Sequence, residues 1–294
     1  MKKVIVFGST GFIGSRLASA LSSFQDMEVT GLGSCQCDLL RLGDARRAME
    51  MADSNTSVVF CSAITRDKEC SEAAMWKNIL MVRNFLSVIP PGGLRSVIFL
   101  SSSAVFGEPP SALPIDEDTA LRPTEYYGFS KVICEELFRW DPCCVNFPVM
   151  ILRPVIVYGE GDRLNSLRGK FVRQLLSQRT VELKGGGEET CDLVHVDDLV
   201  DILCRFVRDP QRGILNVASG QSIVLKQMLR LIGSALSLGV DVNEVKVSSP
   251  SRYSVVFDNR RLRGAFPDLV FTPLEEGIHE YVRYARGNVQ HASR

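Results

Sequence analysis

The sequence has no excess of either charge. Lys plus Arg and Asp plus Glu number 34 each, so the formal net charge at pH 7 is +0. A balanced chain has no long-range field that would draw it to nucleic acid or to an anionic membrane. It also has no apolar run near the ~20 residues that a membrane-spanning helix needs. We therefore expect neither a nucleic-acid nor a membrane partner.

Residues that bind transition metals are also scarce. There are only three histidines, and neither Cys35-x-Cys37 nor Cys143-Cys144 has zinc-ligand spacing, so no metal site is expected. The nine cysteines leave at least one thiol unpaired, and a reducing cytoplasm is the simplest setting. The apolar start is too short for a signal peptide, because it breaks at Gly8.

Short apolar runs alternate with longer amphipathic stretches through the first half of the chain. The runs predict strands buried on both faces: Val4–Phe7, Val29–Leu32, Val58–Cys61, Val97–Leu100 and Val149–Leu152. The stretches predict helices at about 12–23, 72–89 and 125–140, and later ones at about 167–178, 197–208 and 224–237. This alternation predicts an α/β fold built on a Rossmann-like, doubly wound parallel sheet.

A glycine-rich turn follows the first predicted strand and opens a helix. It reads Gly8-Ser9-Thr10-Gly11-Phe12-Ile13-Gly14. Glycines permit a tight turn and a close backbone approach, and a helix N-terminus offers amide donors to a pyrophosphate. We therefore expect residues 1–155 to form an NAD(P)-binding domain, to which segments around 190–216 return. Residues 156–294 would form a smaller, irregular substrate-binding domain.

The second predicted strand lacks an acidic residue at its end. A carboxylate there would bind the free 2′-hydroxyl of the adenosine ribose, and Val29–Ser34 contains none. Its absence favours NADP over NAD, with Ser34 and Arg16 as candidate contacts for the 2′-phosphate. Asp38 is placed to meet the adenine edge, although it could equally cap a helix or turn.

Tyr127 and Lys131 are the candidate reaction centre. A separation of four residues places both side chains on one face of a helix. A nearby ammonium stabilises a phenolate and so lowers the pKa of a tyrosine. Tyr126 has no lysine four residues on. The loop Ser101–Gly107 follows a predicted strand, and a hydroxyl there could bind a substrate carbonyl or alkoxide.

Together these residues resemble the extended short-chain dehydrogenase/reductase family, in its NAD(P)-dependent epimerase/dehydratase branch. The resemblance covers almost the whole chain. The segments that carry it, besides the glycine turn and the Tyr-Lys pair, are Ser101–Gly107, Asn78, Pro114–Asp118, Leu152–Pro154 leading to Tyr158-Gly159, Asp192–Asp198 and Leu215–Gly220.

The resemblance implies roles for particular residues. Tyr127 would be the general acid/base, and Lys131 would lower its pKa and hold the nicotinamide ribose. Ser102 would be the catalytic hydroxyl, with Ser103 as the alternative, and both would contact substrate. The cofactor contacts that it implies are Gly8, Thr10, Gly11, Phe12, Ile13, Gly14, Ser34, Asp38, Ala63, Tyr127, Lys131, Pro154 and Val155. Asn78 would be structural or form a relay, and His195 would be structural.

The resemblance also narrows the reaction. The 4,6-dehydratases of this branch carry an Asp-Glu pair just after the catalytic hydroxyl, whereas this chain has Ser103 and Ala104. The chain is similar to sugar 4-ketoreductases of the dTDP-4-dehydrorhamnose reductase type, which implies NAD(P)H-dependent reduction of a 4-keto sugar. The alternatives are a nucleotide-sugar 4-epimerase with tightly bound NAD and a non-catalytic nucleotide-sensing protein.

One departure from the family pattern leaves open whether the sugar substrate carries a nucleotide. Cys191 stands where many relatives have an arginine that grips the substrate diphosphate. Arg252 is the candidate replacement, with Arg163 and Arg168 as alternatives, because guanidinium groups suit phosphate. The substrate would be a small sugar or nucleotide-sugar. Relatives commonly dimerise through the Tyr-Lys helix, so a homodimer is expected.

Overall fold

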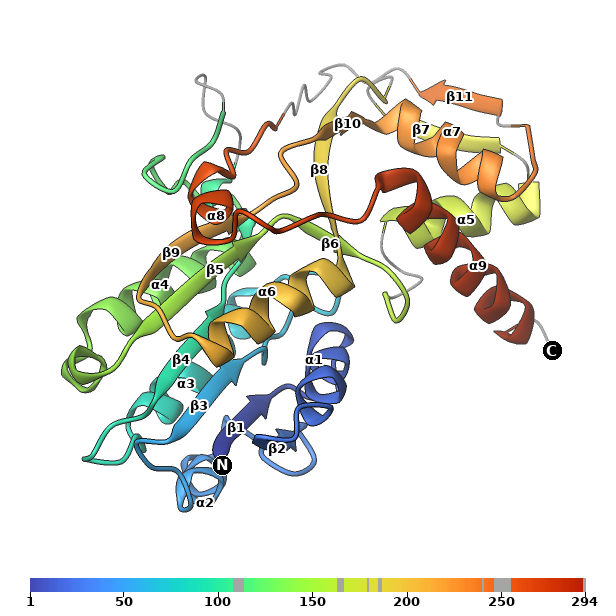
Figure 1. Ribbon diagram of the computed structural model, residues 1–294. Helices are drawn as coiled ribbons and strands as arrows, with labels where there is room; N and C mark the ends of the chain where they lie inside the picture. The colour runs from blue at the N-terminus through green and yellow to red at the C-terminus, as the bar shows by residue number, and fades with distance from the viewer. Residues whose placement is uncertain are drawn as a thin grey trace. The chain divides into compact units, whose positions relative to one another are not determined.

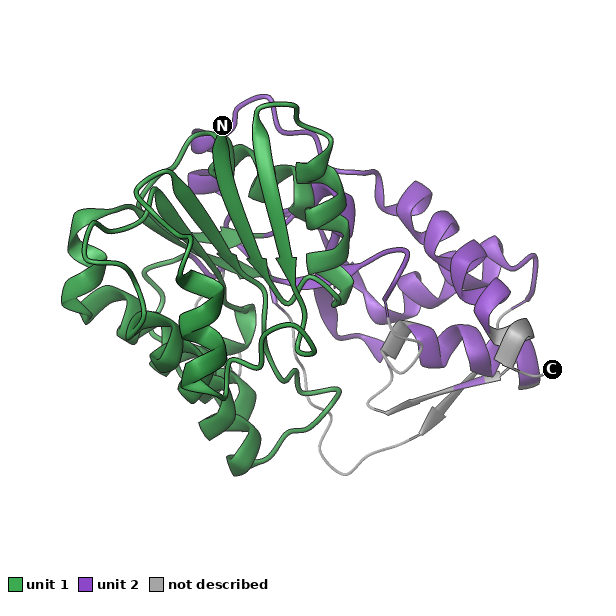
Figure 2. Cartoon of the chain, turned by 90° about the horizontal axis from the view of Figure 1, so that it is seen from below, with its two compact units in different colours: residues 1–108, 117–154, 199–217 green, residues 109–116, 155–198, 218–294 purple. Residues whose placement is uncertain are grey.

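The computed structural model describes residues 1–107, 114–162, 167–178, 180–184, 187–239, 241–245 and 255–292. The chain separates into two compact units that interleave along the sequence (Figure 2). Unit 1 comprises residues 1–108, 117–154 and 199–217. Unit 2 comprises residues 109–116, 155–198 and 218–294.

Unit 1 is an α/β structure. Its strands are β1 (Lys2–Phe7), β2 (Met27–Leu32), β3 (Thr56–Phe60), β4 (Ser96–Leu100), β5 (Val149–Pro154) and β9 (Gly213–Val217). Its helices are α1 (Phe12–Ser22), α2 (Leu42–Met49), α3 (Glu72–Leu86), α4 (Tyr126–Trp140), most of α6 (Val196–Arg208) and the short 3₁₀ segments η1 (Ser103–Phe106) and η2 (Pro142–Asn146).

The six strands form one parallel sheet in the order β2-β1-β3-β4-β5-β9. Helices α1 and α6 lie on one face, and α2, α3 and α4 lie on the other (Figure 1). The predicted α/β fold with a Rossmann-like, doubly wound sheet is therefore confirmed. The strand order changes direction at β1 and β3, and in such sheets ligands bind beyond the carboxyl ends of the strands at that point.

The prediction that every strand is buried on both faces is wrong for β2. β3, β4 and β5 are buried at every residue, whereas Glu28, Thr30 and Gly31 of β2 are exposed. The reason is position, since β2 is the edge strand of the sheet and has a neighbour on one side only.

An aromatic cluster fills the space between the sheet and helices α3 and α4. It consists of Phe7, Phe60, Phe85, Phe99 and Phe138, and the centroids of neighbouring rings lie between 4.9 and 6.5 Å apart. All five rings are fully buried. Each such side chain contributes roughly 1.5–3 kcal/mol of burial free energy, so this cluster fixes α4 against the sheet.

Unit 2 contains two small sheets and helices. Its elements are β6 (Ile156–Tyr158), α5 (Leu167–Gln178), β7 (Thr180–Lys184), β8 (Thr190–His195), β10 (Ser222–Val224), α7 (Leu225–Ala235), β11 (Asp241–Val245), α8 (Arg260–Ala265) and α9 (Leu274–Ala292). The strand orders are β10-β8-β6 and β11-β7. A cluster of buried residues in this unit includes Tyr158, Phe171, Leu229, Ile232 and Tyr281.

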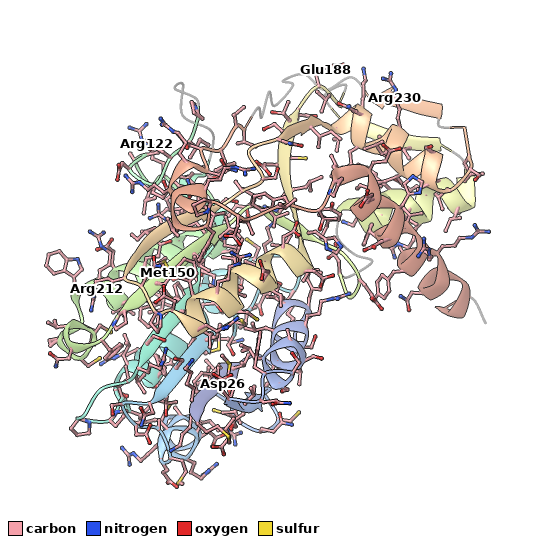
Figure 3. All side chains as sticks on the ribbon, in the orientation of Figure 1. Asp26, Arg122, Met150, Glu188, Arg212 and Arg230 are labelled. Atoms are coloured by element: carbon pink, nitrogen blue, oxygen red, sulfur yellow. The ribbon has the colours of Figure 1, made fainter. Side chains whose placement is uncertain are left out.

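Buried carboxylates hold the connections of unit 2. Asp192 accepts hydrogen bonds from the backbone and hydroxyl of Ser219 and from the amide of Gly220. Burial raises the pKa of Asp192, and these donors oppose the shift. Asp198 accepts from the amide and hydroxyl of Thr272. In unit 1, the side chain of Arg212, which is labelled in Figure 3, also fixes a connection. It donates to the carbonyls of Cys144 and Val145.

Candidate active site

The glycine turn joins β1 to α1 through three close backbone approaches. Gly8 has φ +83°, which favours glycine, and a Cβ there would lie 2.9 Å from the Cys61 carbonyl carbon and the Ser62 amide nitrogen. A Cβ on Gly14 would fall well inside van der Waals contact with the Gly8 carbonyl oxygen. The amide of Gly11 donates to that same oxygen at 2.9 Å. The turn thus presents bare backbone at the switch point of the sheet.

The first turn of α1 is suited to an anion. Gly11 is its N-cap residue, and within the described chain no side chain caps this end and no acidic residue lies in the first turn. Helix N-termini leave amide donors unpaired by the helix itself, and the helix dipole favours negative charge there. Phe12 and Ile13 are the first two residues of the helix, and Thr10 precedes it.

The exit of β2 lies directly against this turn. A Cβ on Gly33 would be 2.5 Å from the Thr10 side chain, and the Gly33 amide donates to Gln36 Oε1 at 3.1 Å. Ser34 is exposed. Asp38 Oδ1 accepts from the Leu40 amide at 3.1 Å, which is the turn-capping role. Gln36 was not among the predicted residues, because the signal sought there was an acid.

The exit of β3 carries Cys61 and the predicted cofactor residue Ala63. Burial raises the pKa of the Cys61 thiol to about 12, with the Lys131 charge opposing the shift. Asn78 on α3 holds the loop that follows: its amide donates to the Ile64 carbonyl at 3.0 Å and its Oδ1 accepts from the Ile64 amide at 2.8 Å. Asn78 Nδ2 also lies 3.3 Å from Ser130 Oγ on α4.

Ser102 follows β4 by two residues and caps η1. Its Oγ accepts from the Ala104 amide at 3.1 Å. Ser103 is the first residue of η1. Gly128 allows α4 to approach this segment closely, because a Cβ there would lie 2.5 Å from the Ala104 carbonyl oxygen. The structure therefore brings the loop that carries Ser102 against the first turn of α4.

Tyr127 and Lys131 lie one turn apart on α4. Lys131 is only 4% exposed, and its Nζ donates to the Leu100 carbonyl at 2.7 Å. The same nitrogen lies 5.7 Å from the centroid of the Tyr127 ring. Tyr127 is half-buried, whereas Tyr126 is 45% exposed. The lysine is thus anchored at the carboxyl end of β4, two residues before Ser102.

The remaining predicted residues fall in different places. Pro154 ends β5 and is buried in unit 1, and Val155, also buried, is the next residue along and belongs to unit 2. Arg252 and Arg163 lie outside the described residues, and so does the side chain of Arg168. Among the described residues, no three His, Cys, Asp or Glu side chains are grouped so that they could hold a metal.

One set of buried polar residues was missed by sequence reasoning. Glu135 on α4 accepts from Ser101 Oγ at 2.5 Å and from Arg153 Nη2 at 2.6 Å. Arg153 Nη1 donates to the Glu117 carbonyl at 3.1 Å. The spacing of Glu135 from Lys131, again four residues, was a signal that could have placed it on the same helix face.

The fold and these residues define an α/β protein with a nucleotide-binding turn and a Tyr-Lys helix at the carboxyl edge of one sheet. The sequence profile described as the NAD dependent epimerase/dehydratase family matches residues 4–218. The chain belongs to this family of enzymes, as its motifs predicted.

Curated relatives extend the match over most of the chain. A dTDP-4-dehydro-6-deoxy-D-allose reductase from Streptomyces bikiniensis is 26% identical and covers 97% of this chain and 96% of its own length. A UDP-glucose 4-epimerase from Vibrio cholerae is 27% identical, with 80% of this chain and 76% of its own covered. The solved structure of RMD from Pseudomonas aeruginosa with NADPH superposes with a TM-score of 0.87 at 19% identity, covering 98% and 100% of the two chains. That structural likeness concerns the fold.

No helix in the described part of the chain combines the length and the apolar character needed to cross a bilayer.

Proposed function

We propose that this protein is an NADPH-dependent reductase of a 4-keto sugar carried on a nucleotide. The observation that carries the proposal is the anchoring of Lys131 to the Leu100 carbonyl, which sets the Tyr127 face of α4 beside the loop that holds Ser102. A half-buried phenol, a buried ammonium and a hydroxyl at the carboxyl edge of a parallel sheet can protonate a carbonyl oxygen as a hydride reaches its carbon.

The glycine turn fits the dinucleotide that this reaction needs. Side chains at Gly8 and Gly14 would fill the space against the backbone of Cys61 and of Gly8 itself, so the turn leaves room for a pyrophosphate to approach the amides of α1. When bound, the cofactor supplies the hydride. Gly8, Thr10, Gly11, Phe12, Ile13 and Gly14 would bind its phosphates, and Ala63, Pro154 and Val155 would border its rings.

The chain's own residues would handle the proton and the orientation of the substrate. Tyr127 would donate its phenolic proton to the oxygen of the reduced carbonyl. Lys131 would stabilise the phenolate that remains and bind the nicotinamide ribose. Ser102 would donate a hydrogen bond to the same substrate oxygen, with Ser103 as the neighbouring hydroxyl, and so resist its rotation away from Tyr127.

NADP is favoured over NAD because the exit of β2 offers no carboxylate. The exposed Ser34 stands there, and the Gln36 side chain turns back onto the Gly33 amide. A 2′-phosphate would meet hydroxyl and amide groups instead of a like charge, with Arg16 as a candidate cation. Asp38 would lie near the adenine, although its Oδ1 already accepts from the Leu40 amide.

The substrate class follows from the relatives' names and the residues around position 103. A reductase of a dTDP-4-dehydro sugar matches nearly the full length of the chain. Ser103 and Ala104 provide no acid and base for water elimination. We place the cofactor in the region 1–155 with the returning segment, and the sugar contacts in 156–294, with Arg252 as the candidate for the substrate phosphates.

A purified-protein assay separates this reductase from its alternatives. With NADPH and a panel of nucleotide-linked 4-keto sugars, a reductase consumes one NADPH per hydroxyl formed. A 4-epimerase, which the Vibrio cholerae relative makes the second candidate, interconverts UDP-glucose and its 4-epimer without net cofactor change. A nucleotide sensor binds NADPH and turns over none of the sugars, and that result would overturn the enzymatic proposal.

The setting that we propose is a reducing cytoplasm. All nine cysteines are free thiols, including Cys143 and Cys144, whose sulfur atoms lie 3.8 Å apart. Disulfides are rare where glutathione and thioredoxin keep thiols reduced. We also propose a homodimer, supported by large apolar side chains exposed on α3 and α4, among them Trp76, Leu80 and Phe129.

A further inference from the structure

The buried ion pair between Glu135 and Arg153 connects α4 to the exits of two neighbouring strands. Glu135 is 0% exposed and Arg153 is 3% exposed. Arg153 Nε lies 3.0 and 3.2 Å from the two carboxylate oxygens, and Nη2 lies 2.6 Å from Oε2. The guanidinium also stacks 5.2 Å from the centroid of the Phe106 ring in η1. The orientation of the carboxylate is therefore fixed from several directions.

Glu135 also accepts a hydrogen bond from the loop that follows β4. Its Oε1 accepts from Ser101 Oγ at 2.5 Å, while the Ser101 amide donates to the Leu152 carbonyl of β5 at 2.8 Å. Ser101 stands between Leu100, whose carbonyl holds Lys131, and Ser102. The hydrogen bond between Ser101 and Glu135 thus links α4 to the one residue that lies between the Leu100 carbonyl and Ser102.

We propose that Ser101 and Glu135, with Arg153 behind them, are positioning residues that hold the Leu100–Ser102 backbone in register with the Tyr127–Lys131 face of α4. The inference rests on the proposed reductase function for its effect on turnover. The hydrogen bond from Ser101 sets where the Leu100 carbonyl meets Lys131 and where the Ser102 hydroxyl points. Misplacement of reacting groups by about 1 Å can lower a rate by as much as roughly a hundredfold.

Stability alone is a poor explanation for this network. Buried ion pairs cost much of their attraction in desolvation, and hydrophobic residues of similar volume often serve the fold as well or better. A carboxylate and a guanidinium give something that hydrophobic packing does not, which is a fixed direction for each hydrogen bond. Here the oriented carboxylate of Glu135 accepts its hydrogen bond from Ser101, at the start of the loop.

The substitution Ser101→Ala tests the positioning role with little risk to folding. It removes the hydroxyl but leaves the Glu135–Arg153 pair intact, whereas Glu135→Ala would strand a buried guanidinium and endanger the fold. The matched control is Ser57→Ala on β3. Ser57 is equally buried, and its Oγ accepts from Ser96 Oγ at 2.9 Å near the opposite ends of β3 and β4.

We expect kcat to fall roughly tenfold to a hundredfold in Ser101→Ala, while KM for the sugar and Kd for NADPH stay within about twofold. Ser57→Ala should keep the wild-type kcat, and both variants should lose a similar, small amount of thermal stability. A kcat for Ser101→Ala within about twofold of that of Ser57→Ala would overturn the inference.

Amide hydrogen exchange tests the same inference without any substrate. The Ala104 amide donates to Ser102 Oγ, and the Val105 amide donates to the Ser102 carbonyl. Both amides should exchange faster in Ser101→Ala than in wild type and in Ser57→Ala. Unchanged exchange overturns the inference whatever the activity. If the wild type reduces no 4-keto sugar, the proposed function is wrong but the positioning role is still untouched by that result. The exchange rates then decide the positioning role.

Discussion

Two adjacent tyrosines begin α4, and only one of them is suited to proton transfer. Tyr127 is half-buried and lies on the face that carries Lys131, whereas Tyr126 is exposed. Tyr127→Phe removes the proton donor but keeps the ring, so we expect kcat to fall by about 10²- to 10⁴-fold with Kd for NADPH nearly unchanged. Tyr126→Phe is the matched control and should keep full turnover. A rate that survives in Tyr127→Phe would remove this residue from the mechanism.

Cofactor choice can be tested at Ser34, at the exit of β2. Ser34 is exposed, so Ser34→Asp should leave the fold intact while placing a carboxylate where a 2′-phosphate would lie. Like-charge repulsion should raise Kd for NADPH about tenfold, equivalent to about 1.4 kcal/mol, and leave Kd for NADH equal or lower. Titration calorimetry of the two cofactors measures both constants, and Ser34→Asn controls for side-chain size. Equal losses for NADPH and NADH would contradict the assignment.

Some residues of the candidate site could be predicted from the sequence, and others could not. The glycine turn and the Tyr-Lys pair were found because their spacing is local, within seven residues of chain. Glu135 was missed because its partners Ser101 and Arg153 are 34 and 18 residues away, and only the fold brings them together. The role of Asp38 had two interpretations, and one of its carboxylate oxygens is engaged by the Leu40 amide.

The predicted strands agree best with the observed ones where the strand is buried along its whole length. The runs at 58–61, 97–100 and 149–152 overlap the fully buried strands β3, β4 and β5, with ends that differ by up to two residues, and 125–140 matches α4 within one residue. Helices α2 and α9 were not predicted, because each is largely polar. α9 does bury Ile278, Tyr281, Val282 and Ala285, whose spacing is that of one face of a helix.

The packing of α1 on the glycine turn depends on a missing side chain. A Cβ on Gly14 would overlap the Gly8 carbonyl oxygen, which is backbone and cannot rotate away. Gly14→Ala should therefore displace the start of α1, lower stability by about 1–3 kcal/mol and weaken dinucleotide binding by at least about tenfold. Thermal unfolding and NADPH titration measure the two effects.

Gly43 in α2 provides the control for that substitution. A Cβ there would meet no atom within 4 Å, so Gly43→Ala should be neutral or stabilising by up to about 1 kcal/mol and should not affect NADPH binding. If Gly14→Ala binds NADPH as tightly as Gly43→Ala does, the turn is not the pyrophosphate site.

At the scale of the whole molecule, the chain passes between its units more than once. It leaves unit 1 after Pro154, returns at Leu199–Val217 to add β9 beside β5, and ends in unit 2. The sequence predicts a boundary at 155/156 and a return around 190–216. Local patterns could not assign β8 and β9 to different sheets, because both are short strands and only long-range pairing separates them.

Several exposed apolar residues of unit 1 lie on α3 and α4, two helices that pack side by side, and they predict self-association. Trp76 and Leu80 lie one turn apart on α3, and Phe129 lies on α4, which packs beside α3. We expect a homodimer of twice the 32.6 kDa chain mass, because burying such side chains yields about 25 cal/mol for each Å² of apolar surface.

The double substitution Leu80→Lys and Phe129→Lys should shift sedimentation to the monomer, since lysines facing one another across an interface repel and must be desolvated. Val270→Lys, at an apolar residue of unit 2 that is even more exposed than Leu80 and Phe129, should leave the dimer intact. A wild-type chain that sediments as a monomer at micromolar concentration would exclude α3 and α4 as a stable interface.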